Sequence, residues 1–135
     1  MELVIDANIL FAALIKSGKT RELLLNDELA IYAPEFLIEE FMENLKELED
    51  KVGVGRRELE EVVEELITNS NIKIIPKKEI EPYILKAKEI SPDPKDFVYL
   101  ALALRKRCGI WSNDKRLKVQ GEVKVYSTKE ILELL

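Results

Sequence analysis

The chain contains no histidine and only one cysteine, Cys108, and these absences narrow the kinds of site that it can build. A single cysteine allows neither an intrachain disulfide nor a cysteine-rich zinc site. A cluster of metal ligands in this sequence must therefore rely on oxygen atoms. Oxygen ligands favour Mg²⁺ or Mn²⁺, and with them the chemistry of phosphates.

Long apolar runs are absent too, since none approaches the roughly 20 residues that a transmembrane helix needs. The chain opens with Met1 and Glu2 and reaches an aspartate at Asp6, which is unlike a signal peptide. From these two observations we expect a cytoplasmic protein without a membrane partner.

The sequence also lacks an excess of positive charge. Its formal net charge is −5, which argues against a polycation that coats nucleic acid. A nuclease stays compatible with this charge, because carboxylates that hold metal belong to the acidic total. With 47% apolar and 35% charged residues in a chain of 135, the composition predicts one soluble domain, residues 1–135.

Short apolar segments alternate with amphipathic ones along the chain. Strands are predicted at 3–5, 30–33, 72–75, 108–111 and 123–126. Helices are predicted from about 9 to a break at Ser17-Gly18, at 20–26, 34–50, 56–68, 79–90 and 96–106, then as a short turn at 114–117 and a last helix capped by Thr128. This alternation predicts an α/β fold, a three-layer α/β/α sandwich around a central five-stranded parallel sheet. The nearly apolar helix at 96–106 should lie deep against that sheet.

Four aspartates stand where the chain leaves a strand or enters a helix: Asp6, Asp93, Asp96 and Asp114. The carboxyl ends of parallel strands meet at one edge of a sheet, and ligands bind there at the point where the strand order reverses. Carboxylates gathered at such a point repel one another and lose hydration unless a cation lies among them. The pattern therefore predicts one acidic pocket that holds a divalent ion.

Each aspartate also has an explanation as a helix cap. Asp93 precedes Pro94 and suits an N-cap, which would place Asp96 at the third helical position. Asp6 and Asp114 suit caps of the elements that follow them. Capping accounts for one acid per helix, but it gives no reason for these helices to flank one crevice.

A fifth acid is expected on the helix at 34–50, whose apolar face contains Leu37, Phe41, Leu45 and Leu48. On a helical wheel Glu39 points away from this face, whereas Glu40 lies at its border and can reach inward. We interpret Glu40 as the acid of the pocket and Glu39 as a solvated charge.

Four segments resemble, in order, the motifs of the PIN-domain family. Residues 4–8 (VIDAN) look like the opening Asp-x-Asn motif, and residues 34–41 (PEFLIEEF) are similar to the second, in which a glutamate precedes an apolar residue. Residues 93–104 resemble the third motif, acids that lead into an Ala-rich helix. Residues 110–117 (IWSNDKRL) resemble the fourth, a strand that closes on Ser/Thr-x-Asp.

The resemblance implies a PIN-like (Rossmann-like) fold and an Mg²⁺- or Mn²⁺-dependent endoribonuclease that hydrolyses phosphodiester bonds in single-stranded RNA. The implied catalytic and metal-binding residues are Asp6, Glu40, Asp96 and Asp114, with Asp93 as a further ligand or water-mediated partner. Asn8 and Ser112 are placed to orient the carboxylates or the phosphate, although capping and turn formation explain them equally well. Many members of the family are toxins of the VapC type, which pair with an antitoxin protein and often form homodimers.

Two basic groups could guide the backbone of a nucleic-acid strand past the acids: Lys16, Lys19 and Arg21, and Lys115, Arg116 and Lys118. A solvated surface is the commoner role for such residues.

Other classes fit the sequence less well. A phospho-aspartate protein would need an Asp-x-Asp after the first strand, and a dinucleotide-binding fold a Gly-x-Gly-x-x-Gly turn, and neither is present. The alternative that stays open is a catalytically silent PIN-like scaffold that binds RNA or a partner protein. The filled acidic positions favour the nuclease.

Overall fold

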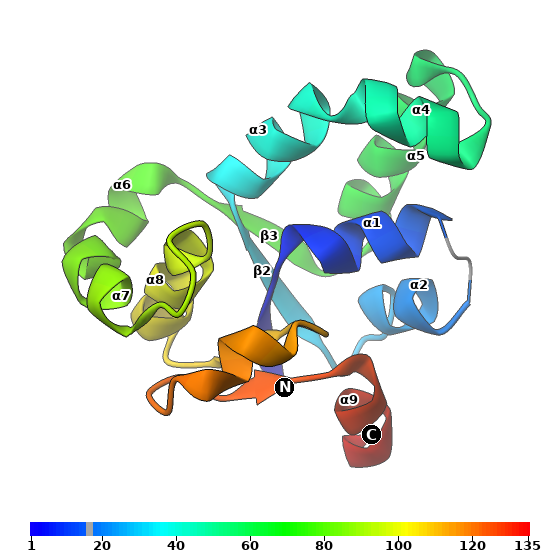
Figure 1. Ribbon diagram of the computed structural model, residues 1–135. Coiled ribbons are helices and arrows are strands. Elements are labelled where there is room, and N and C mark those ends of the chain that lie inside the picture. Colours follow the sequence, from blue (N-terminus) through cyan, green and yellow to red (C-terminus); the bar gives the residue numbers. More distant parts are fainter. Residues whose placement is uncertain (16–17) are drawn as a thin grey trace.

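The centre of the molecule is a five-stranded sheet in which every pair of neighbouring strands is parallel. The structure is a computed structural model and describes residues 1–15 and 18–135. The strands, in the spatial order β3-β2-β1-β4-β5, are β1 (Glu2–Ile5), β2 (Ala30–Pro34), β3 (Ile72–Ile75), β4 (Gly109–Trp111) and β5 (Val125–Tyr126). Helices lie on both sides of the sheet (Figure 1), so the predicted three-layer α/β/α sandwich is confirmed.

Strand β1 occupies the middle of this sheet. Its residues Leu3, Val4 and Ile5 are fully buried, as expected for a parallel strand that is covered on both faces. The chain runs from β1 outward through β2 to β3 and later returns to the opposite side of β1 to form β4 and β5. The strand order therefore reverses between β1 and β4, and the predicted ligand-binding point lies at the carboxyl ends of these two strands.

The first group of helices consists of α1 (Ala7–Ile15), α2 (Lys19–Leu24), α3 (Glu35–Glu43), α4 (Leu45–Val52) and α5 (Arg56–Asn69). The second consists of α6 (Lys77–Ile80), the 3₁₀ helix η1 (Glu81–Tyr83), α7 (Ile84–Ile90) and α8 (Phe97–Lys106). Figure 1 shows α6, α7 and α8 together on one side of the sheet and α1, α2, α4 and α5 on the other. None of the helices within the described ranges has the length and apolar character to cross a membrane.

Helix α8 is the deepest helix of the fold, as its sequence predicts. It packs against β1, β2 and β4, and residues 99–103 are buried in succession. The helix begins at Phe97, one residue later than predicted. Since its amino terminus lies beside the carboxyl ends of the central strands, α8 brings the preceding acidic turn to the predicted edge.

Two of the predicted helices are interrupted. The helix expected at 34–50 is divided into α3 and α4 at Asn44, whose side-chain amide donates a hydrogen bond to the Glu40 carbonyl at 2.9 Å and competes with the backbone ladder. Pro34, expected in the first helical turn, is instead the last residue of β2. The helix expected at 79–90 contains η1 because Pro82 has no backbone N–H to continue an α-helix.

Smaller differences concern the chain ends and the boundaries. The last helix, α9 (Thr128–Leu134), is capped by Ser127 rather than Thr128. The Ser127 hydroxyl accepts from the Glu130 amide at 3.2 Å, and the Glu130 carboxylate accepts from the Ser127 amide at 3.1 Å, which is a capping box. The predicted strand at 123–126 contains only Val125–Tyr126. Ser17 of the predicted break, Lys16, and the side chain of Leu48 lie outside the described residues.

Candidate active site

Asp6 follows β1 directly, at the centre of the predicted edge. Its side chain is only 7% exposed. One carboxylate oxygen accepts a hydrogen bond from the Ser112 hydroxyl at 2.5 Å, and the other accepts from the Ile9 amide at 3.1 Å, which caps α1. Burial raises the pKa of Asp6, the hydrogen bond from Ser112 opposes that rise, and the charge of Asp114 adds to it. The carboxylate is therefore fixed in place at a position that disfavours its charge.

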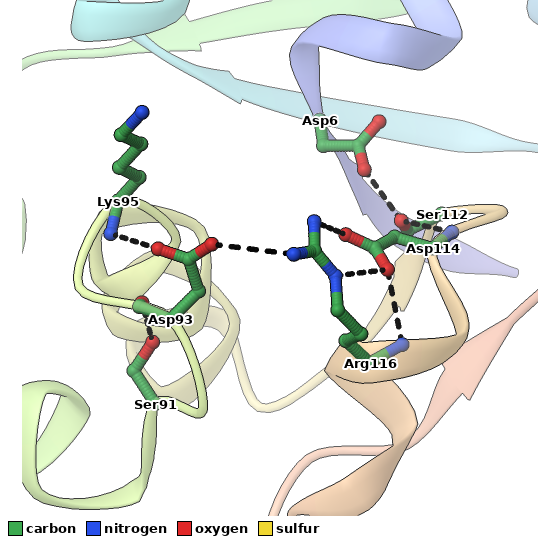
Figure 2. A network of polar contacts seen from close by, with 7 residues as sticks. All are labelled: Asp6, Ser91, Asp93, Lys95, Ser112, Asp114 and Arg116. Atoms are coloured by element: carbon green, nitrogen blue, oxygen red, sulfur yellow. Dashed lines mark hydrogen bonds and ion pairs between the residues drawn. The ribbon is translucent and has the colours of Figure 1, made fainter.

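Ser112 connects the ends of β1 and β4. Its side chain is fully buried, and its hydroxyl oxygen also accepts a hydrogen bond from the Asp114 amide at 3.1 Å. The same hydroxyl thus holds Asp6 through its donated bond and Asp114 through its accepted one (Figure 2). In this way two acids that are far apart in the sequence share one anchor at the point where the strand order reverses.

Arg116 lies between two of the acids. Its guanidinium contacts the Asp114 carboxylate at 3.2 and 3.3 Å, and another of its nitrogens lies 4.0 Å from the Asp93 carboxylate (Figure 2). These contacts hold the pKa of Asp114 below its usual range. The sequence pattern suggested only a surface cation near the site, whereas the side chain turns back onto the acids. The separation of Asp114 and Arg116 by two residues in the sequence does not predict this contact.

Asp93 and Asp96 belong to the turn before α8. The Asp93 carboxylate accepts from the Lys95 amide at 2.9 Å, and the Ser91 hydroxyl donates to the Asp93 carbonyl oxygen. The interpretation of Asp93 as the helix cap with Asp96 at the third helical position is wrong, because α8 begins at Phe97 and Asp96 itself precedes it. The reason is that Asp93 uses its carboxylate in the turn rather than on the helix.

The Asp96 carboxylate is partly exposed, and its pKa departs strongly from the ordinary value of an aspartate. It occupies the N-cap position of α8 but makes no capping hydrogen bond. Burial raises the pKa of Asp96 to about 6, and the charges of Asp93, Asp114 and Asp6 contribute to this rise. Because such effects weaken with distance, acids from three separate segments of the chain lie near one another at this edge of the sheet.

The two glutamates of α3 lie as the helical wheel predicts. Glu39 is exposed and forms an ion pair with Lys77 at 3.4 Å. Glu40 is half-buried, and its charge acts on the buried Tyr99 phenol, together with the charges of Asp6 and Asp96. Glu40 therefore lies near the same phenol as Asp6 and Asp96. We call the group formed by Asp6, Glu40, Asp93, Asp96 and Asp114 the acid edge.

The acid edge suits a hard divalent cation in its chemistry, because its donors are carboxylate oxygens and a guanidinium already lies between two of them. As the side chains are placed, no three acidic or cysteine side chains of the described residues converge closely enough to hold a metal ion. A bound ion would thus require Arg116 to withdraw and the carboxylates to rotate inward.

The polar and basic residues predicted to support the site differ in their exposure and in their contacts. Asn8 is exposed in the first turn of α1, and its backbone N–H lowers the pKa of Asp6. Arg21 donates to the Ala13 carbonyl at 2.9 Å, so it holds α2 against α1. Lys118 forms an ion pair with Glu130. Lys19 and Lys115 are exposed, while Lys16 lies outside the described residues.

Known proteins resemble the chain in family and in fold. A family model described as PIN domain matches residues 4–135. No curated protein matches the sequence. A chain in a toxin–antitoxin complex from Klebsiella pneumoniae is 15% identical, with a TM-score of 0.66 over 93% of this chain and 97% of that chain. A chain of VapBC2 from Rickettsia felis, bound to a DNA fragment from their promoter, is 14% identical, with a TM-score of 0.70 over 94% and 98%. At these identities the likeness concerns the fold.

Proposed function

Because the chain belongs to the PIN-domain family, a family of nucleases, we propose that it is a metal-dependent endoribonuclease. Its reaction is the hydrolysis of phosphodiester bonds in single-stranded RNA. Mg²⁺ or Mn²⁺ is held by Asp6, Glu40, Asp96 and Asp114, with Asp93 as a further ligand or water-mediated partner. The observation that carries this proposal is the mutual electrostatic effect of acids from separate segments at the reversal of strand order.

The raised pKa values at the acid edge support a cation as the natural occupant. Burial and like charges disfavour ionised Asp6 and Asp96, and a divalent ion removes that repulsion. When bound, such an ion supplies an activated water and neutralises charge that develops on the phosphoryl oxygens.

The remaining roles belong to residues of the chain itself. Ser112 holds Asp6 and the backbone at Asp114 in register, so these two acids present a fixed frame to a phosphate. Asn8, exposed next to Asp6, is available as a hydrogen-bond donor to the substrate. Arg116 neutralises Asp93 and Asp114 until they are needed as ligands.

A toxin role is the more specific form of this proposal. One of the similar structures is a toxin–antitoxin complex and another is VapBC2, and each similarity covers nearly the whole chain. We propose an antitoxin protein as the partner, a homodimer as the assembly, and cytoplasmic RNA as the target. Expression of the chain alone should arrest growth, and co-expression of the neighbouring reading frame upstream should restore it. An RNA-processing enzyme would show neither effect.

Cleavage of defined single-stranded RNAs tests the activity. The wild-type protein should cut them in Mg²⁺ or Mn²⁺ and stop when a chelator is added. Asp114→Asn should lose the activity. Glu39→Gln, which changes the exposed carboxylate next to Glu40 in the sequence, should keep it. A silent scaffold would neither cut RNA nor bind Mn²⁺ in calorimetry, and that pair of results would overturn the proposal.

A further inference from the structure

Tyr99 is a buried residue near the acid edge, and no sequence pattern distinguishes it. It belongs to α8, three residues after Asp96, so both residues lie on the same side of the helix. The side chain is 3% exposed. The backbone N–H of Ala7, the residue after Asp6, acts on its phenol oxygen. The hydroxyl therefore lies beside the end of β1.

The hydroxyl of Tyr99 donates its proton to no acceptor among the described residues. A buried polar group left unpaired costs about 1–3 kcal/mol, so proteins rarely keep one without a use. A phenylalanine would fill the same space in this apolar helix without that cost. The proton of this hydroxyl is therefore available to an acceptor.

The charges of three carboxylates act on this hydroxyl. After burial itself, the charge of Glu40 contributes most to the raised pKa of Tyr99, followed by Asp6, with Asp96 contributing less. Because these effects disfavour the phenolate, the hydroxyl keeps its proton and can donate it in a hydrogen bond. The Asp6 carboxylate already accepts hydrogen bonds from Ser112 and from the Ile9 amide, so we take Glu40 as the acceptor.

We propose that Tyr99 is a positioning residue of the acid edge: its hydroxyl donates a hydrogen bond to the Glu40 carboxylate, directly or through one water, and so orients Glu40 for metal binding. This inference rests on the proposed metal site. It adds to that site a group outside the carboxylates.

The replacement Tyr99→Phe separates this role from a purely structural one. In the presence of a chelator, the variant should melt at the same temperature as the wild type or higher, because it removes an unpaired buried hydroxyl. Its affinity for Mn²⁺ should nevertheless fall by about tenfold or more, as observed for groups that orient metal ligands. RNA cleavage should fall at low Mn²⁺ and recover when the Mn²⁺ concentration is raised.

Tyr32→Phe is the matched control. The Tyr32 hydroxyl also meets a carboxylate, donating to Glu2 at 2.7 Å, but Glu2 is the first residue of β1 and lies at the opposite end of that strand from Asp6. This variant should bind Mn²⁺ as the wild type does. If Tyr99→Phe lowers the melting temperature of the metal-free protein and leaves the Mn²⁺ affinity unchanged, Tyr99 is a packing residue and the inference is wrong.

A double variant identifies the acceptor. If Tyr99 acts through Glu40, adding Tyr99→Phe to Glu40→Gln should cause little further loss of Mn²⁺ affinity. Equal losses in both backgrounds would contradict the pairing. Failure of the proposed function looks different, because then the wild-type protein itself binds no Mn²⁺. Wild-type binding together with an unchanged Tyr99→Phe variant overturns only the role of Tyr99.

Discussion

The acid edge has two sides that differ in how their polar groups are satisfied. On the strand side, formed by Asp6, Ser112 and Asp114, every side chain has hydrogen-bond partners. On the helix side, formed by Glu40, Asp96 and Tyr99, Asp96 makes no capping bond and the Tyr99 hydroxyl has no partner among the described residues.

This difference indicates which polar groups serve the fold and which serve a ligand. The strand side is complete without a ligand, and its hydrogen bonds explain why Asp6 and Asp114 stand where they do, as caps and as links between β1 and β4. The helix side is incomplete, and folding alone gives no reason for its half-buried charges and its unpaired hydroxyl proton. The unsatisfied groups on the helix side are therefore the better evidence that the acid edge binds a ligand.

The largest effect is expected for a change on the helix side that alters activity and not folding. Asp96→Asn should reduce RNA cleavage on the order of a thousandfold, because the loss of a metal ligand removes several kcal/mol of charge stabilisation. The folded protein should persist, as measured by circular dichroism and thermal melting. Cleavage at the wild-type rate would mean that the helix side does not take part in the reaction.

A change on the strand side should instead reduce stability. Ser112→Ala removes the hydroxyl that holds Asp6 and the Asp114 amide, and it should lower the free energy of unfolding by about 1–3 kcal/mol. Urea denaturation measures the difference. Ser70→Ala is the control, because the buried Ser70 hydroxyl has no partner among the described residues and its removal should cost nothing. Similar losses in both variants would contradict the comparison.

The pH dependence of the stability of the metal-free protein should show which side of the acid edge has the larger effect on folding. The pKa of Asp96 is about 6 in the folded protein and near 4 in an unfolded chain, so the folded state binds the extra proton between these values. The contribution of Asp96 to stability therefore falls as the pH rises from about 4 to about 6, and Asp6 acts in the same direction. Asp114, whose pKa is lowered, acts in the opposite direction, but at pH values below this window.

Thermal melts in chelator across this window measure the sum. We expect the melting temperature to decline toward pH 6, and Asp96→Asn to weaken the decline. A steeper decline in the variant would contradict the assignment of the titrating group.

The smallest effect is expected for Arg116, which connects the two sides. Arg116→Ala removes the cation that lies between Asp93 and Asp114, so Mn²⁺ should bind a few-fold more tightly. Lys115→Ala removes the same charge from an exposed neighbouring position and serves as the control in calorimetry. Weaker Mn²⁺ binding by the Arg116 variant would show that the guanidinium supports the ion rather than competing with it.

The sequence predicted the strand side better than the helix side. Asp6 and Asp114 each follow an apolar strand, and the geometry of parallel sheets alone brings such positions to one edge. On the helix side only Glu40 could be predicted in the same way, because the apolar face of α3 leaves one of its two central glutamates able to turn inward. These are consequences of backbone periodicity, which a sequence pattern records directly.

Other features depend on side-chain choices that periodicity does not record. Asn44 interrupts a helical pattern that continues on both of its sides, because its amide bonds to the Glu40 carbonyl. Arg116 has many open rotamers, and its inward turn is a matter of which charges lie nearby. Tyr99 reads as one more residue of an apolar helix, since no pattern distinguishes a phenol with a partner from one without.

The central place of β1 has a consequence for durability. Hydrogen exchange and local melting begin at the outer rows of a sheet, and here those rows are β3 and the two-residue β5. Leu3, Val4 and Ile5 are shielded by neighbours on both flanks, so their amides should be among the last to exchange. The residue that follows them, Asp6, is therefore anchored to the part of the molecule that loosens last, and partial fraying of the rim leaves its position intact.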